Sequence, residues 1–115
     1  MISTPLRRLD YDDLLILRGL LHGVTVGGCA KLIGVTQPAV SQRLRKIEQI
    51  LETTVIYHRA YYPQKDLPAK LSKIGIMLAT AAEAALIIME GVYSDIHQER
   101  TKTKLEGIDK REVDK

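Results

Sequence analysis

Aromatic residues and cysteine are scarce in this sequence. The 115 residues include five Tyr but no Phe or Trp, so aliphatic side chains and alanine must fill most of any core. The single cysteine, Cys29, excludes an intrachain disulfide and cannot form a thiolate metal site by itself. We interpret it as a small buried apolar residue rather than a redox sensor.

Targeting and membrane signals are weak. Arg7 and Arg8 lead into LDYDDLL instead of the apolar run of a signal peptide, which favours a cytoplasmic protein. Residues 74–93 have the length of a membrane span. However, Glu83 and Glu90 would be costly in hydrocarbon, and alanine adds little insertion energy. A long helix that is buried or dimerises is the better interpretation, and no membrane partner is expected.

Patterns typical of catalysis or metal binding are also missing. His22, His58 and His97 are not spaced as metal ligands, and neither paired carboxylates nor a Ser–His arrangement suggests a reaction. Glu83 and Glu90 are seven residues apart, which fits solvated positions beside a helix–helix contact. We therefore expect no enzyme, no cofactor and no metal site.

Charge is distributed unevenly along the chain. Residues 1–75 hold 11 Lys and Arg against 6 Asp and Glu, whereas residues 76–115 hold 6 against 8. A polyanion would therefore bind the front half. The length fits one domain with some additional chain, and a hydrophobic content of 45% is sufficient for a folded core.

Apolar spacing predicts two short helices near the N-terminus. The first spans roughly residues 10–22, with Asp10 as its N-cap and Gly23 as its stop. The second spans about 27–33 and stops at Gly34. It starts at a pair of glycines, which cap a helix less well than Ser, Thr or Asp but permit close approach of another backbone.

A third helix follows after a short turn. Thr36 can cap it, Pro38 lies in its first turn where no N–H is required, and it runs to about Leu51. The second and third helices together make a helix-turn-helix. The apolar face of the third helix is predicted to consist of Val40, Leu44, Ile47 and Leu51.

The opposite face of the third helix is polar, and no acidic residue occurs from 35 to 47. Polarity alone fits a solvated surface equally well, but the preceding short helix and the tight turn favour contact with nucleic acid. Gln37, Ser41, Gln42 and Arg45 are expected to read base edges, because amides, hydroxyls and guanidinium groups make such hydrogen bonds. The complete set of expected DNA contacts on this helix is Thr36, Gln37, Pro38, Ser41, Gln42, Arg43, Arg45 and Lys46, with Arg43 and Lys46 at phosphates.

Residues 52–71 change in character. TTVIYHRA suits a short strand, and residues 69–71 could return as a second one, which would form a β-hairpin wing. Arg59 and Lys65 in this segment are expected to contact the DNA backbone or minor groove. The alternative is that the neighbouring tyrosines pack on the hairpin while these cations are merely solvated.

A long helix is predicted from its cap, Ser72, to about residue 100. Most of its apolar positions lie three or four residues apart, which favours a contact between two helices. We expect antiparallel pairing with a second copy of the chain. The charged residues 101–115 are expected to form a flexible tail. The residues expected at the dimer contact are Ile74, Met77, Leu78, Ala81, Ala85, Ile88, Val92 and Ile96.

The helix-turn-helix resembles the DNA-binding region of the LysR-type transcriptional regulators of bacteria. Residues 35–41, VTQPAVS, match the family pattern V-S-Q-P-A-V-S almost letter for letter. Ile47, Glu48 and Leu51 match the L-E-x-x-L that ends the basic helix of the family. The sequence LSKIG at 71–75 resembles the L-T-x-A-G that begins the family's linker helix.

The sequence departs from the family at a few positions. Gly27 and Gly28 replace a hydroxyl and a basic residue, and His58 replaces an arginine. The resemblance covers about residues 6–95. No segment after it is expected to fold as the ligand-sensing domain of the family.

The resemblance implies a mainly α winged helix-turn-helix protein. The DNA-binding domain would span residues 1–71, a linker and dimerisation helix 72–100, and the tail 101–115. It implies a homodimeric, sequence-specific transcription regulator that binds a pseudo-palindromic operator and is nucleoid-associated when bound. One alternative is an interaction module that forms mixed dimers with a related full-length regulator. Another is a molybdate-regulator-like domain of similar winged architecture.

Overall fold

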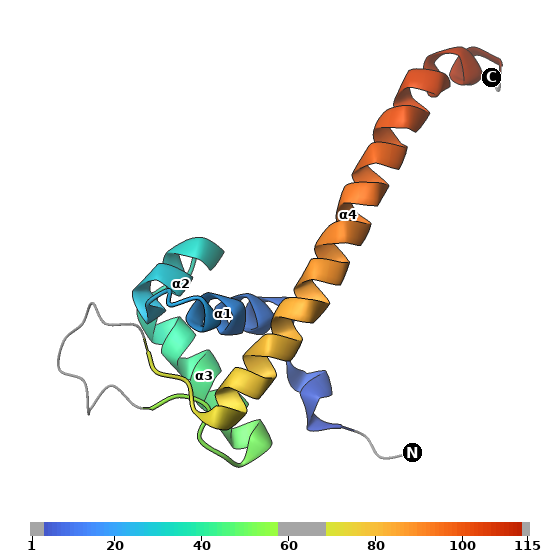
Figure 1. Ribbon diagram of the computed structural model, residues 1–115. Coiled ribbons are helices and arrows are strands. Elements are labelled where there is room, and N and C mark those ends of the chain that lie inside the picture. Colours follow the sequence, from blue (N-terminus) through green and yellow to red (C-terminus); the bar gives the residue numbers. More distant parts are fainter. Residues whose placement is uncertain (1–3, 58–68, 114–115) are drawn as a thin grey trace. The chain divides into compact units, whose positions relative to one another are not determined.

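The computed structural model describes residues 4–57 and 69–113 of the chain, with side chains described up to residue 106. The mainly helical prediction is confirmed (Figure 1). The chain divides into two compact units, Met1–Ala84 and Ala85–Lys115. The elements in chain order are a 3-10 helix η1 (Pro5–Arg8), α1 (Tyr11–Leu21), α2 (Val26–Ile33), α3 (Gln37–Leu51) and α4 (Lys73–Val113).

Helix α1 begins at a reciprocal capping box. Asp10 Oδ1 accepts a hydrogen bond from the backbone N–H of Asp13 at 2.9 Å, and Asp13 Oδ2 accepts one from the N–H of Asp10 at 3.0 Å. The helix ends at the C-cap His22, followed by Gly23 with a φ of 83°. Both predicted ends are confirmed, whereas the part of Asp13 in the cap is new.

Helix α2 begins at Val26, one residue before the predicted start at Gly27. The predicted start was wrong because Thr25 supplies the cap: its Oγ1 accepts the N–H of Gly28 at 2.9 Å. Glycine at position 28 avoids a steric clash, because a Cβ there would lie 2.7 Å from Val24 Cγ1. Gly34, with a φ of 73°, ends the helix as predicted.

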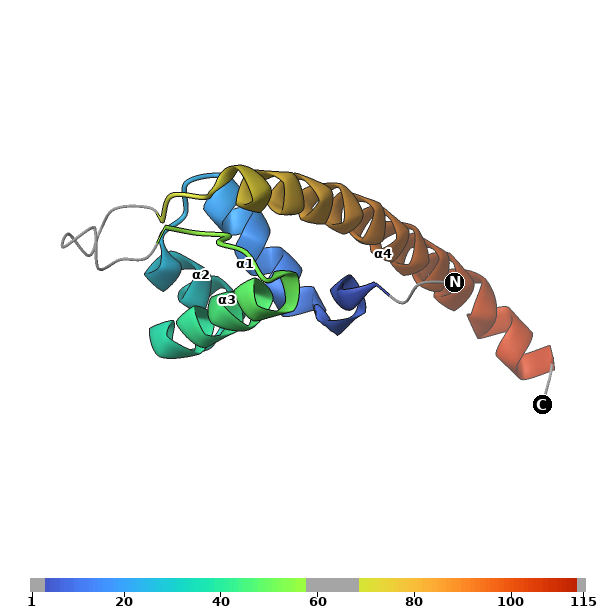
Figure 2. The same cartoon turned by 90° about the horizontal axis from the view of Figure 1, so that it is seen from below.

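Helix α3 packs its apolar face on α1 and α2 (Figure 2). Val40, Leu44 and Ile47 are buried, as predicted. Ile50 is also buried, whereas Leu51 is partly buried and packs against the core. The other residues of the buried core are Ile16, Leu17, Leu20, Val26, Cys29, Ala30, Val55, Ile56, Ala69, Ala79 and Ala82.

Helix α4 begins at Ser72, whose Oγ accepts the N–H of Gly75 at 3.0 Å and donates to the carbonyl of Thr54 at 2.6 Å. The predicted cap is therefore confirmed. The helix continues to Val113, so its predicted end near residue 100 was wrong. The sequence beyond residue 97 is rich in Gln, Glu, Lys and Arg and lacks proline, which favours continued helix.

The apolar part of α4 bears on the membrane question. By length and composition alone, Lys73–Glu106 could cross a membrane, with a mean hydropathy of 1.7 over an 18-residue window. In the first unit, however, Ala79 and Ala82 are buried in the core. A membrane span that included them would have to withdraw them from that core.

The expected wing is represented by one antiparallel bridge between Ile56 and Leu71. The N–H of Tyr57 donates to the carbonyl of Lys70 at 2.9 Å. Within residues 4–57 and 69–113 no strand is found, so the two predicted strands shorten to this bridge. Residues 58–68, where the rest of the hairpin is predicted, lie outside the described part of the chain.

Candidate nucleic-acid interface

The exposed face of α3 presents a row of polar side chains. Pro38, Gln42 and Arg45 are exposed and follow one another at i, i+4 and i+7, which places them on one side of the helix. Gln49 continues the row at i+11 and is also exposed. It is absent from the sequence prediction, although the same spacing identifies it. Ser41 borders this face and is half-buried, so the row combines amide, hydroxyl and guanidinium groups.

The N-terminus of α3 lies beside the first turn of α2. Thr36 Oγ1 accepts the N–H of Ala39 at 3.2 Å, which confirms the predicted cap. Gln37 is exposed, and a Cβ at Gly27 would lie 3.5 Å from its Oε1. That distance is ordinary van der Waals contact, so the start of α3 and the first turn of α2 are close neighbours. Free N–H groups and the helix dipole make such an end favourable for a phosphate.

Arg43 and Lys46 point toward the start of α1. Arg43 Nη1 lies 2.9 Å from each carboxylate oxygen of Asp10 and 3.2 Å from Asp13 Oδ1. Arg43 Nη2 lies 3.7 Å from Asp12 Oδ2. Lys46 Nζ lies 3.4 Å from Asp13 Oδ2. Sequence analysis assigned both cations to phosphates and missed these aspartates, for which the acidic run DYDD was the available signal.

The electrostatics of this group favour its ionised state. Burial would raise the pKa of Asp10, but the hydrogen bonds from the N–H of Asp13 and from Arg43 outweigh that effect and lower it. The hydrogen bond to Asp10 in turn raises the pKa of Arg43. Asp13 is fully buried and retains charged partners, as a buried carboxylate requires.

The base of the expected wing is attached to α3 by Glu48. Glu48 Oε2 accepts the N–H of Val55 at 2.8 Å and that of Ile56 at 3.3 Å. Close by, Lys70 Nζ lies 5.9 Å from the centroid of the Tyr57 ring, a cation–π distance. The two wing cations expected at DNA, Arg59 and Lys65, lie outside the described residues.

Most residues of α4 predicted to dimerise are exposed. Leu78 is partly buried against the core of the first unit. In that unit the exposed members are Ile74, Met77 and Ala81; in the second unit they are Ala85, Ile88, Val92 and Ile96. The exposed fractions of Met77 and Ile88 reach 64% and 66%, which is high for large apolar side chains.

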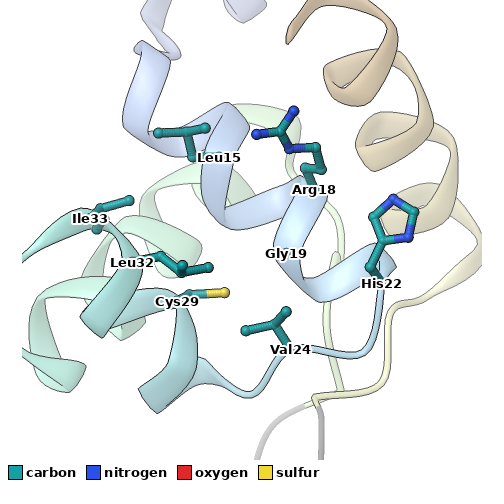
Figure 3. A pocket seen from close by; sticks show the side chains of 8 residues that line it. All are labelled: Leu15, Arg18, Gly19, His22, Val24, Cys29, Leu32 and Ile33. Atoms are coloured by element: carbon teal, nitrogen blue, oxygen red, sulfur yellow. The ribbon is translucent and has the colours of Figure 1, made fainter. Parts of the chain in front are cut away.

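A pocket of about 370 Å³ lies between α1 and α2 and is lined in part by Leu15, Arg18 and Cys29 (Figure 3). It holds none of the predicted DNA contacts and is therefore separate from the exposed face of α3. At its rim, His22 Nε2 contacts Glu83 Oε2, so Glu83 has a partner within the first unit instead of being a merely solvated flank residue. In the described part of the chain, no three His, Cys, Asp or Glu side chains are grouped as metal ligands.

Solved structures of transcription regulators share this arrangement. LysG from Corynebacterium glutamicum, a full-length LysR-type regulator with bound effector Arg, matches 79% of the chain with a TM-score of 0.63 and 18% identity. A probable transcriptional regulator from Pseudomonas aeruginosa matches 79% with a TM-score of 0.63 and 25% identity. The DNA-binding domain of BenM, in complex with catB site 1 DNA, matches 75% with a TM-score of 0.61 and 15% identity.

The chain has the fold of a LysR-type DNA-binding region. The resemblance noted in the sequence is thereby confirmed at the level of structure. The chain spans 29% of LysG and 28% of the Pseudomonas protein, but 86% of the BenM domain. No protein-family model matches the sequence, and no curated protein matches it at a significant level.

Proposed function

We propose that this protein is a homodimeric transcription regulator of the LysR type that binds duplex DNA in a sequence-specific manner. The observation that carries the proposal is the exposed row Pro38, Gln42, Arg45 and Gln49 on the second helix of a helix-turn-helix. That helix enters the major groove in helix-turn-helix proteins. Support also comes from the BenM domain, a protein of similar fold that was solved on DNA.

The side chains divide into reading and anchoring groups. Gln37, Ser41, Gln42 and Arg45 read base edges, because Gln37, Gln42 and Arg45 are exposed, Ser41 borders them, and their amide, hydroxyl and guanidinium groups hydrogen-bond to bases. The capped N-terminus of α3 at Thr36 holds a phosphate. From the wing, Arg59 and Lys65 add contacts to the backbone or minor groove. The function requires no cofactor and is exercised in the cytoplasm, on the nucleoid.

Dimerisation would follow from the exposed apolar residues of α4. Met77, Ile88, Val92 and Ile96 are all more than two-fifths exposed, and burial against a second helix would remove this apolar area from water. Two copies would place their α3 helices in successive major grooves about 34 Å apart. A pseudo-palindromic operator is the matching DNA. Alternatively, the same exposed residues bind a related full-length regulator. This protein would then modulate that regulator by forming mixed dimers with it.

DNA binding is tested by selecting bound sequences from a random duplex pool and titrating the selected site with salt. We expect a two-fold symmetric motif and an affinity that falls steeply with salt. Arg45→Gln should weaken binding by about 1–3 kcal/mol and relax selection at one position of each half-site. Lys102→Gln, which removes an exposed cation from α4, is the matched control. If no duplex shows salt-sensitive binding, the proposal fails.

The dimer is tested by sedimentation of the purified chain. We expect the wild type to sediment as a dimer and Ile88→Glu to dissociate it, because a charge would be buried at the seam. Gln98→Glu adds the same charge at another exposed position of α4 and should leave the dimer intact. Purification from native cells distinguishes the alternative: recovery with a related regulator, without a homodimer, would favour mixed dimers.

A further inference from the structure

Three aspartates at the start of α1 surround one arginine of α3. We call Asp10, Asp12, Asp13 and Arg43 the acidic clasp. Its contacts to Arg43 are two of 2.9 Å to Asp10, one of 3.2 Å to Asp13 and one of 3.7 Å to Asp12. The partners are about thirty positions apart in sequence, so the clasp joins the first helix to the proposed recognition helix.

The acidic clasp differs from an ordinary surface ion pair because its centre is buried. Asp13 is fully buried, and both of its carboxylate oxygens are engaged. Oδ1 faces Arg43, while Oδ2 faces Lys46 and accepts the N–H of Asp10. The side chain of Arg43 is itself only 28% exposed. A partly buried, multiply hydrogen-bonded arginine is held in one orientation, unlike a freely solvated one.

The side of α3 held by the clasp is distinct from its exposed row. Arg43 and Lys46 are three residues apart and both face α1. Pro38, Gln42, Arg45 and Gln49 occupy another side of the helix. Fixing the α1 side of α3 therefore fixes the rotation of the helix about its axis, and with it the direction in which the exposed row faces.

We propose that the acidic clasp positions the recognition helix, so that Arg43 supports DNA binding by orienting α3 and not by contacting a phosphate. This inference rests on the proposed function. Asp10, Asp13 and Arg43 are then positioning residues, and the loss of Arg43 should leave the salt dependence of DNA binding unchanged. A plot of log K against log salt concentration has a negative slope, and each lost phosphate contact reduces the magnitude of that slope by about 0.9. A contact that is made twice in a dimer therefore accounts for about 1.8. A residue that acts only through orientation changes affinity without changing the slope.

The test compares the wild type with Arg43→Gln, Asp10→Asn and the double variant, each on the selected operator over a range of salt concentrations. Asn caps a helix as well as Asp, so Asp10→Asn removes the charge of Asp10 from the clasp and keeps the cap of α1. We expect each single variant to bind roughly five-fold more weakly, as for a partly exposed ion pair, with an unchanged slope. The double variant should be no weaker than Arg43→Gln, because Arg43→Gln by itself already loses the ion pair with Asp10.

Circular dichroism and urea unfolding establish which variants are folded under the binding conditions. Asp12→Asn, which removes only the 3.7 Å contact, is the mild variant should Arg43→Gln be unfolded. If the magnitude of the salt slope decreased by about 1.8 in Arg43→Gln, Arg43 would contact a phosphate directly. That result would overturn the inference and leave the proposed function intact. Wild-type affinity in the folded variants would also overturn it, because the clasp would then only stabilise the fold. Failure of the wild type itself to bind any duplex would reject the proposed function, and the inference with it, before any variant is compared.

Discussion

Gly75 and the carbonyl group of Val55 approach so closely that a Cβ at position 75 would lie 2.1 Å from the Val55 oxygen. The same oxygen accepts the N–H of Ser72 at 2.8 Å. The first turn of α4 is thus docked directly on the backbone that leads into the wing. The glycine of LSKIG is required by this contact, since no side chain fits between the two backbones.

Gly75→Ala should destabilise the first unit by about 1–3 kcal/mol, because the backbone of Val55 must shift to relieve the overlap. Gly91→Ala is the matched control in the same helix, as a Cβ there would meet nothing within 4 Å. In an exposed helical position, alanine should stabilise by up to about 1 kcal/mol relative to glycine. Urea unfolding measures both values. Equal effects of the two substitutions would contradict the proposed close approach.

Glu48→Ala should cost about 1–3 kcal/mol, because the N–H of the fully buried Val55 loses its acceptor. Gln49→Ala, at the exposed neighbouring position, should change the free energy of unfolding by less than about 0.5 kcal/mol. Amide hydrogen exchange measures the local effect: the backbone amides of Val55 and Ile56 should exchange faster in Glu48→Ala than in the wild type. Unchanged protection of these two amides would show that another group holds the wing base.

The helix-turn-helix could be predicted because its signals are local. Thr36 as cap, Pro38 in the first turn and Gly34 in the left-handed region each act within a few residues of their own positions. The partners of Arg43 could not be predicted in this way, since Asp10 lies 33 positions earlier and only the packing of α3 on α1 brings the two together. The spacing rule correctly placed Leu51 against the core but did not select its neighbour Ile50, which is the more buried of the two.

The stability of the acidic clasp should depend on pH on the acid side. The pKa of Asp10 is lowered below its ordinary value of 3.8, so the folded protein binds this proton more weakly than the unfolded chain does. The charged carboxylate therefore stabilises the fold above about pH 4, and this contribution is lost as the pH falls through the lower, folded-state pKa. Because the Asp10 side chain is 54% exposed, solvent screening limits the effect to less than about 1 kcal/mol.

The measurement is the difference in free energy of unfolding between the wild type and Asp10→Asn. It should be largest near pH 6 and smaller near pH 3, because the contribution is lost as the pH falls through the lowered folded-state pKa of Asp10. Asp95→Asn, at an exposed aspartate of α4 outside the clasp, is the control. A difference of equal size at both pH values would show that the charge of Asp10 contributes nothing, and that only the cap matters.

The thiol of Cys29 should be protected in the native protein. Cys29 is 1% exposed, burial raises its pKa, and its Sγ lies 3.7 Å from the carbonyl oxygen of Ile16. The thiolate is the reactive species, so a buried thiol with a raised pKa should react with a disulfide reagent at pH 8 only as fast as the protein opens. In urea the reaction should be complete within the time of mixing.

The control is the double variant Cys29→Ala, Thr101→Cys, which carries its thiol at an exposed position of α4. It should react fast whether it is folded or not. If the native wild type reacted as fast as that variant, the pocket between α1 and α2 would admit the reagent to Cys29, and the interpretation of Cys29 as a buried apolar residue would be wrong.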